Sequence, residues 1–397
     1  MVERMRWVLL FLFPPALAQV SIPFWHTAGP PGQAPLEEAI QAFNQSQRRY
    51  RLEARYAGEY REAGVKLLAA LRSGGAPVLF QAELSFLPRL AQEGLALPLD
   101  GELGTPPDDL YPEALKSGQV KGRTYGLPIG LSLPVLYYNL DAFRAKGLKP
   151  PSTWDEVEKA AGALKSRTAR GLVLSTDIWS FNALVMSLGG SLVRDGRPTF
   201  TSPEAVEALE RLYRMVQRQD ALARNLAEAQ FAVADFLRTK AFMGLAPTTA
   251  LPVVLYHTSL PFQVGYAPLP RTPKGSVPLS GAALVVLKGA SPEQVKGAVA
   301  FWRFFTEAKW MARWVETTHY VPFRKSAEAE LRDFLKDPMR KAVFAQMEVA
   351  RPWNQDPEMV LWYSYLEEAL EKSLKQGVPP LKALEEAQKR ALAVETR

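Results

Sequence analysis

Short apolar segments alternate with amphipathic segments over residues 20–80. The segments Val20–Phe24, 51–56 and 77–80 predict strands, from their apolar runs or their alternating pattern. Helices are predicted between them, over 36–47 and 60–72, where apolar residues recur on one face. Strands that alternate with helices favour parallel sheets covered by helices on both faces. This part of the chain is therefore predicted to have an α/β fold.

A second α/β stretch begins at the extended apolar run Leu133–Asn139. Further along, Thr153 and Glu156 have the spacing of a capping box, which predicts a helix from there through Leu164. More strands are predicted at Gly171–Leu174, Phe242–Ala246, Val264–Ala267 and Ala282–Leu287. The alternation of strands and helices therefore continues through most of the chain.

Two helix starts are predicted from caps, and the C-terminal quarter is predicted to be almost entirely helical. Ser202-Pro203 in the middle of the chain and Ser291-Pro292 each place a capping serine before a proline at the first helical position. From Glu293 onward the pattern is helical, with long amphipathic segments at Val360–Lys375 and Pro380–Val394. No period of 20–50 residues repeats, so a repeat architecture is not expected.

The pattern divides most naturally into two α/β lobes, each a mostly parallel sheet flanked by helices. A seam is predicted near 131–134, and Pro-containing connections near 278–280 and Pro322 predict two further crossings. We therefore assign 19–131 and 279–322 to the first lobe. The second lobe is assigned 132–278 and 323–397, which includes the helical C-terminal region.

Residues 1–18 have the layout of a secretory signal peptide. Arg4 and Arg6 precede the apolar run Trp7–Phe13, and Ala16-Leu17-Ala18 supplies small residues at a cleavage site. The run is shorter than the roughly 20 residues that cross a bilayer, which argues against the alternative of an uncleaved anchor. We therefore expect export to the periplasm or the exterior of the cell envelope, with a mature chain that starts near Gln19.

Composition narrows the class of protein. The chain has no cysteine, which excludes catalytic thiols, disulfides and thiolate metal sites. Its net charge of +7 is spread along the chain rather than clustered, so a polymeric nucleic acid is not an expected partner. Abundant proline and scarce asparagine predict a heat-adapted host.

The search for catalytic motifs finds little. The three histidines, His26, His257 and His319, form no metal-ligand pair, and no cofactor or metal is expected. Gly130–Pro134 lacks the second glycine of a nucleophile elbow, and no phosphate-binding glycine loop occurs. A glycosidase needs only two suitably spaced carboxylates, and the 41 acidic residues leave that alternative open.

Four residues are candidates for a binding cleft on their position alone. Glu83 follows the predicted strand 77–80, at the carboxyl end where open α/β sheets bind ligands. Trp179 follows a strand and a turn, while Tyr60 and Tyr320 lie at junctions between loops and elements. Each of these four side chains has an ordinary alternative, as a packed aromatic ring or a solvated loop charge.

Several short segments together resemble the extracytoplasmic solute-binding proteins of ABC importers. Within their sugar-binding group, the chain is most similar to the branch that binds glycerol-3-phosphate and glycerophosphodiesters. The matching segments, in the family's order, are Ile22–His26, Phe43-Asn44, Tyr56–Tyr60, Pro134–Asn139 and His319–Pro322.

The resemblance implies a Venus-flytrap fold, in which two lobes joined by crossing segments close on a ligand. It also implies a set of ligand-binding residues, on the positions that match the family's motifs. These are Tyr60, Glu83, Ser132, Trp179, Gly281 and Tyr320, with Thr248 as a less certain match. Hydroxyl groups and glycine N–H groups suit phosphate oxygens. Glu83 would repel a phosphate, so we expect it to hold hydroxyls at the opposite end of the ligand.

One departure from the family's pattern bears on the ligand. Members of this branch carry a phosphate-binding arginine in the C-terminal region, but Pro357–Tyr363 has none. Arg351 lies close in sequence and is the candidate replacement. Because an arginine–phosphate contact is strong, its loss disfavours a small phosphomonoester. The tryptophan content suits a larger phosphodiester such as glycerophosphocholine, whose ammonium group can lie on an aromatic face.

The sequence therefore predicts a non-enzymatic, monomeric binding protein that delivers a small phosphate ester to the membrane permease of an ABC transporter. Two alternatives stay within this class, an oligosaccharide and a nucleotide-like phosphodiester as ligand. The alternative of another class is a secreted glycoside or phosphodiester hydrolase.

Overall fold

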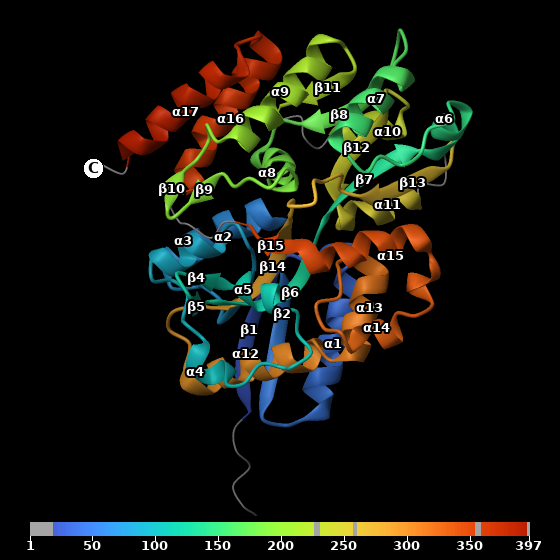
Figure 1. Cartoon of the computed structure of the whole chain (residues 1–397). Helices are drawn as coiled ribbons and strands as arrows, with labels where there is room; N and C mark the ends of the chain where they lie inside the picture. Colours follow the sequence, from blue (N-terminus) through green and yellow to red (C-terminus); the bar gives the residue numbers. More distant parts are fainter. Residues whose placement is uncertain (1–18, 226–230, 257–259, 354–358, 395–397) are drawn as a thin grey trace, which may run out of the picture.

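The computed structural model describes residues 19–225, 231–256, 260–353 and 359–394. They form two lobes, each built on its own sheet and covered by helices, with one lobe above the other in Figure 1. The predicted two-lobed α/β fold is confirmed. The predicted signal peptide, residues 1–18, lies outside the described residues.

The first lobe is built on a mixed sheet with the strand order β15-β14-β3-β1-β2, and β6 pairs with β14. Its strands are β1 (Val20–His26), β2 (Tyr50–Tyr56), β3 (Leu79–Glu83), β6 (Gly126–Ser132), β14 (Val277–Val286) and β15 (Ala350–Pro352). Strand β1 runs parallel to β2 and β3, as predicted, whereas β14 runs antiparallel to β3 and β6. The reversal arises because β14 enters this sheet from the second lobe.

The second lobe is built on a sheet with the order β11-β8-β12-β7-β13. Its strands are β7 (Pro134–Asn139), β8 (Arg170–Ser175), β11 (Ala221–Arg224), β12 (Ala241–Pro247) and β13 (Val264–Pro268). Strand β8 is parallel to β11 and β12, and β7 is antiparallel to β12 and β13. Two short hairpins, β4 (Gln119–Val120) with β5 (Arg123–Thr124) and β9 (Val193–Arg194) with β10 (Arg197–Pro198), stand apart from both sheets.

Helices cover both sheets (Figure 1). Those up to residue 150 are α1 (Gln33–Ser46), α2 (Tyr60–Ser73), α3 (Leu87–Gln92), α4 (Asp100–Leu103), α5 (Pro112–Lys116) and α6 (Leu140–Ala145). Those of the middle of the chain are α7 (Trp154–Leu164), α8 (Ile178–Ser187), α9 (Pro203–Gln217), α10 (Phe231–Leu237) and α11 (Leu251–Leu255). The C-terminal ones are α12 (Pro292–Phe305), α13 (Ala308–Thr318), α14 (Ala327–Glu330), α15 (Pro338–Phe344), α16 (Met359–Gln376) and α17 (Pro380–Val394). Among the helices of the described residues, none is both long and apolar enough to span a bilayer.

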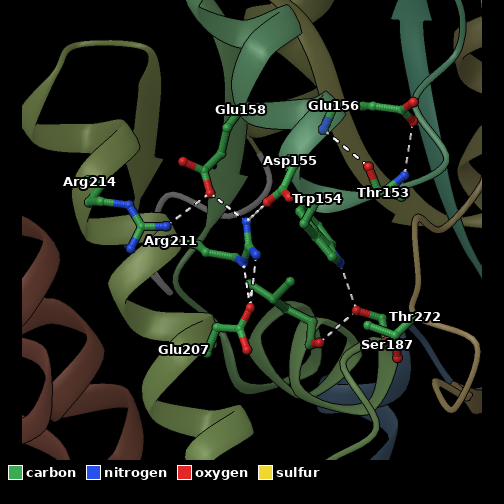
Figure 2. Close-up of polar contacts among 11 residues, drawn as sticks. Thr153, Trp154, Asp155, Glu156, Glu158, Ser187, Glu207, Arg211, Arg214 and Thr272 are labelled. Atoms are coloured by element: carbon green, nitrogen blue, oxygen red, sulfur yellow. Dashed lines mark hydrogen bonds and ion pairs between the residues drawn. The ribbon is translucent and has the colours of Figure 1, made fainter.

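The helix caps predicted from the sequence are confirmed. The Thr153 hydroxyl accepts a hydrogen bond from the backbone N–H of Glu156, whose carboxylate accepts one from the N–H of Thr153 (Figure 2). Ser291 and Gln294 form the same reciprocal box at α12, whereas Ser202 caps α9 only by accepting from the N–H of Ala205; each serine precedes a proline. Because a side chain replaces a missing backbone partner, such caps are readable from sequence alone.

An ion cluster around the mostly buried Arg211 joins two helices of the second lobe. Arg211 of α9 donates to Asp155 and Glu158 of α7, at 2.6 and 2.8 Å, and to Glu207 of its own helix (Figure 2). Its side chain is only 15% exposed, so it exchanges most of its hydration for these three carboxylates. The cluster therefore sets the position of α7 relative to α9.

The chain crosses between the lobes at several points. Strand β6 ends at Ser132 and β7 begins at Pro134, while β14 begins at Val277 after β13 of the second sheet. After α13 the chain passes to α15, which packs against β13, and then returns to the first sheet as β15. Helices α16 and α17 then pack on α8 and α9 of the second lobe. The predicted lobe boundaries stay a prediction.

The imidazole of His319 is buried in the protein interior. His319 ends α13 with a left-handed φ of 56°, its side chain is fully buried, and neither ring nitrogen has a partner among the described residues. Burial, together with the nearby charge of Arg340, lowers its pKa to about 4, against the partly opposing charge of Asp337. Its ring packs edge-on against Phe334 and Tyr256. The imidazole is therefore neutral in the folded protein at neutral pH.

We expect acid to destabilise the fold through His319. The unfolded chain takes up this proton near pH 6.5 and the folded chain only near pH 4, so stability falls as pH drops from 6.5 to 4. His319→Asn, which tolerates a positive φ, should remove roughly 1–3 kcal/mol of that loss. Urea unfolding of both proteins at several pH values measures it. Identical pH profiles would show that His319 is not a source of the acid sensitivity.

Candidate functional site

The carboxyl ends of the first three strands bring Tyr60 and Glu83 to one edge of the first sheet. Strands β1, β2 and β3 are parallel, β3 ends at Glu83, and α2 begins at Tyr60 shortly after β2. In open α/β sheets this edge is where ligands bind. Burial raises the pKa of the Glu83 carboxyl above its usual value, and a hydrogen bond with Ser85 partly offsets the rise.

The pairing of β14 with β6 places Gly281 of β14 and Ser132 of β6 beside that edge. Its register opposes Ser280 to Ser132 and Gly281 to Leu131. Gly281 has a φ of +132°, and a Cβ atom there would lie 2.0 Å from the carbonyl oxygen of Gly130. Glycine is therefore required both by the backbone conformation and by the close approach of β6.

Tyr60 and Tyr320 form a hydrogen-bonded pair. Their hydroxyl oxygens lie 2.9 Å apart, and the ring of Tyr320 stacks on Trp314 with an interplanar angle of 11°. Burial raises the pKa of both hydroxyls, so both are protonated at neutral pH. One of the two hydroxyls donates its proton to the other, so the second hydroxyl keeps a proton that it can donate to a ligand.

The second lobe contributes Trp179 from the first turn of α8. Asp177 caps this helix by accepting from the N–H of Ser180 at 2.8 Å, and thereby fixes where the tryptophan lies. The Trp179 indole N–H donates to the Ser280 hydroxyl at 3.2 Å, and that hydroxyl lies 3.0 Å from the Ser132 hydroxyl. A polar chain therefore runs from α8 to β14 and β6.

These side chains line one cavity of about 370 Å³ between the lobes. Six of the eight predicted site residues line it, namely Tyr60, Glu83, Ser132, Trp179, Gly281 and Tyr320. The residues that sequence reasoning missed include Ser85, Asp177, Thr249, Ser280, Trp353 and Glu367. Ser280 could have been found, since it directly precedes Gly281. Glu367 of α16 could not, because only the tertiary fold brings that helix to the cavity.

The structure corrects the placement of two predicted residues. Thr248 is fully buried and lies outside the cavity lining, which its neighbour Thr249 joins instead. Arg351 is exposed on β15, where Ala350 takes the buried side of the strand. Its guanidinium donates to the Ala350 carbonyl, and its side chain lines a different cavity of about 320 Å³.

The charge of the cavity is one-sided. Its acidic residues are Glu83, Asp177 and Glu367, and among the described residues that line it none is lysine, arginine or histidine. Burial raises the pKa of Glu367, as does the nearby charge of Asp177, although its carboxylate accepts a hydrogen bond from the N–H of Ile178. Hydroxyl-bearing residues, the tryptophans Trp179 and Trp353, and several apolar residues also line it. The arrangement suits a ligand that donates hydrogen bonds and offers an apolar face.

No metal site is apparent in the part of the chain that the structure describes. There, no group of three or more histidine, aspartate or glutamate side chains lies close enough to hold an ion. Of the chain's three histidines, His26 and His319 are buried, and His257 lies outside the described residues.

Comparison with known proteins places this site in context. Residues 38–342 match the family model described as bacterial extracellular solute-binding protein. The chain is 25% identical over 343 residues to the sn-glycerol-3-phosphate-binding periplasmic protein UgpB of Yersinia enterocolitica, covering 79% of this chain and 76% of that protein. The corresponding protein of Salmonella typhimurium is also 25% identical, over 339 residues. The resemblance inferred from the sequence motifs is confirmed.

Solved structures agree with these relatives. UgpB from Mycobacterium tuberculosis in complex with glycerophosphocholine superposes with a TM-score of 0.83 at 26% identity, covering 95% of this chain and 98% of that one. The cyclic alpha-maltosyl-1,6-maltose binding protein from Arthrobacter globiformis has a TM-score of 0.82 at 21% identity, covering 95% and 99%, and shows the fold alone. The relatives are binding proteins, in agreement at family level with the predicted non-enzymatic class.

We expect Gly281→Ala to be strongly destabilising. It introduces both an unfavourable φ and a methyl group in contact with the Gly130 carbonyl. Gly289→Ala is the matched control, because Gly289 has a φ of +97° with open space around its Cβ position. The control should lose about 1 kcal/mol of unfolding free energy from backbone strain and Gly281→Ala about 1–3 kcal/mol more, measured by urea unfolding. Equal losses would contradict the close packing of β6 on β14.

Proposed function

Since the chain belongs to the family of bacterial extracellular solute-binding proteins, we propose that it captures a small hydroxyl-bearing phosphodiester, such as glycerophosphocholine. In this proposal the exported, monomeric protein carries the ligand to the permease of an ABC importer. The observation that carries the proposal is the cavity between the lobes, lined by Tyr60, Glu83, Ser132, Trp179, Gly281 and Tyr320. A relative of the same fold at 26% identity is described with glycerophosphocholine.

The cavity's chemistry supports a diester rather than a monoester. A phosphomonoester carries close to two negative charges at pH 7, and the cavity lining presents carboxylates with no facing cation among its described residues. A diester carries a single negative charge, and its hydroxyl-bearing end can donate to Glu83 and to the Ser132–Ser280 pair. Glycerol-3-phosphate is therefore the weaker candidate, although curated relatives are named for it.

A neutral oligosaccharide is the second candidate. Trp179 and Trp353 offer flat apolar faces in the same cavity as Glu83, Asp177 and Glu367. Aromatic faces beside hydrogen-bond acceptors suit sugar rings and their hydroxyls. The absence of a cation from the described lining is no penalty for such a ligand.

We expect isothermal titration calorimetry of the purified protein to rank glycerophosphocholine above glycerol-3-phosphate by about tenfold or more, the penalty of one poorly compensated charge. Maltotriose serves as the neutral comparison. Tighter binding of maltotriose than of either phosphate ester would favour the second candidate. Release of free choline from glycerophosphocholine, abolished in Glu83→Gln, would instead favour a hydrolase.

Trp179→Ala should weaken the preferred ligand by about 1–3 kcal/mol, because it removes an aromatic face from the cavity wall. Trp310→Ala is the matched control, since Trp310 of α13 packs on Phe304 and lies outside the lining of the cavity. Calorimetry well below the melting temperature separates binding from stability. If both variants bind like the parent protein, the ligand does not contact this wall.

A further inference from the structure

A second chamber of about 470 Å³ adjoins the cavity between the lobes. The two share Tyr60, Glu83, Ser85, Ile178, Trp353 and Glu367 as common walls. We refer to the cavity between the lobes as the inner chamber and to its neighbour as the outer chamber. The two chambers therefore lie side by side, on either side of these six residues.

The outer chamber supplies the cations that the inner chamber's described lining lacks. Arg61 and Arg89 line it. The Arg89 guanidinium donates to Glu93, four residues further along the chain, at 2.7 Å. The Arg61 side chain is exposed and makes no hydrogen bond or ion pair with the residues that the structure describes. Arg61 is therefore the cation available to a ligand anion.

One face of α2 forms an apolar wall of the outer chamber next to Arg61. Val65 and Leu68 follow Arg61 at helical spacing, so the three side chains share that face. Val65 is 65% exposed, so its side chain is open to contact from a ligand. Phe86 from the segment after β3 completes the wall. A group attached to the phosphate has an apolar surface to cover here.

We propose that the outer chamber is the subsite for the phosphate and its second substituent, and that Arg61 contacts the phosphate. This inference rests on the proposed function and deepens it. The hydroxyl-bearing end of the ligand lies in the inner chamber with Glu83 and Ser132, and the phosphate lies beyond the carboxylates, at the arginine. The second substituent of the diester lies on the wall of Val65 and Phe86. In this proposal Arg61, rather than Arg351, replaces the family's phosphate-binding arginine.

The test compares two arginines on the same helix. Arg61→Gln removes the phosphate contact, and Arg72→Gln removes the same charge from the last turn of α2, outside both chambers. Glycerophosphocholine affinity should fall about tenfold or more in Arg61→Gln, the effect of one hydrogen bond to a charged group. It should change less than about twofold in Arg72→Gln, where the charge lies far from the ligand. Arg61→Lys should recover part of the loss, because it restores the charge without the planar fork.

Salt dependence gives a second readout. Affinity of the parent protein should fall between low and high ionic strength, and this slope should flatten in Arg61→Gln but not in Arg72→Gln. Val65→Asn, which removes apolar surface beside the second substituent without adding a charge, should weaken glycerophosphocholine and leave maltotriose unaffected. If the parent protein binds glycerophosphocholine, and Arg61→Gln changes neither the affinity nor its salt dependence, this inference is wrong and the proposed function stands. A parent protein that binds no glycerophosphodiester would overturn both.

Discussion

The antiparallel pairing of β14 with both β3 and β6 is the constraint on which the site depends. This strand arrives from the second lobe and inserts between two strands of the first, opposing Ala282 to Glu83 and Ser280 to Ser132. Since strand register moves in whole residues, a slip of one position would turn every cavity residue of β14 to the opposite face. The glycine at 281 is what allows β6 to approach closely enough for this pairing. The positions of Glu83, Ser132 and Ser280 therefore follow from a single register.

The carboxylates of the inner chamber then restrict the charge of the ligands that it can bind. Two unit charges 5 Å apart interact by about 3 kcal/mol at an effective dielectric constant of 20, so carboxylates can outweigh several neutral hydrogen bonds to an anion. Glu83 and Glu367 soften this penalty, because burial raises the pKa of both. Their acceptor oxygens still favour donors, which are hydroxyls or a cation. A ligand with an anionic group must keep that group at a distance from them.

Sequence reasoning was most accurate where one local interaction decides the structure. The caps at Thr153, Ser202 and Ser291 need only a side chain and the next turn of helix, and all three are confirmed. The carboxyl-end position of Glu83 followed from strand order alone. Glu367 was missed because a residue on a C-terminal helix reaches the cavity only through packing of α16 on α8. Arg351 was misplaced because proximity in sequence says nothing about which face of a three-residue strand a side chain takes.

Closure on a ligand requires contacts with both lobes, because a ligand shifts a conformational equilibrium only by its difference in affinity between the two states. The inner chamber meets this requirement, with Tyr60 and Glu83 on one side and Trp179 and Glu367 on the other. The bond from the Trp179 indole to Ser280 already joins α8 to the crossing strand. A ligand hydroxyl at Ser280 would share that serine's single proton and lone pairs with Ser132 and Trp179, so binding and lobe contact are coupled at one oxygen. In the proposed complex the same serine would therefore bind the ligand and join the lobes, so that a small solute could hold two large lobes together.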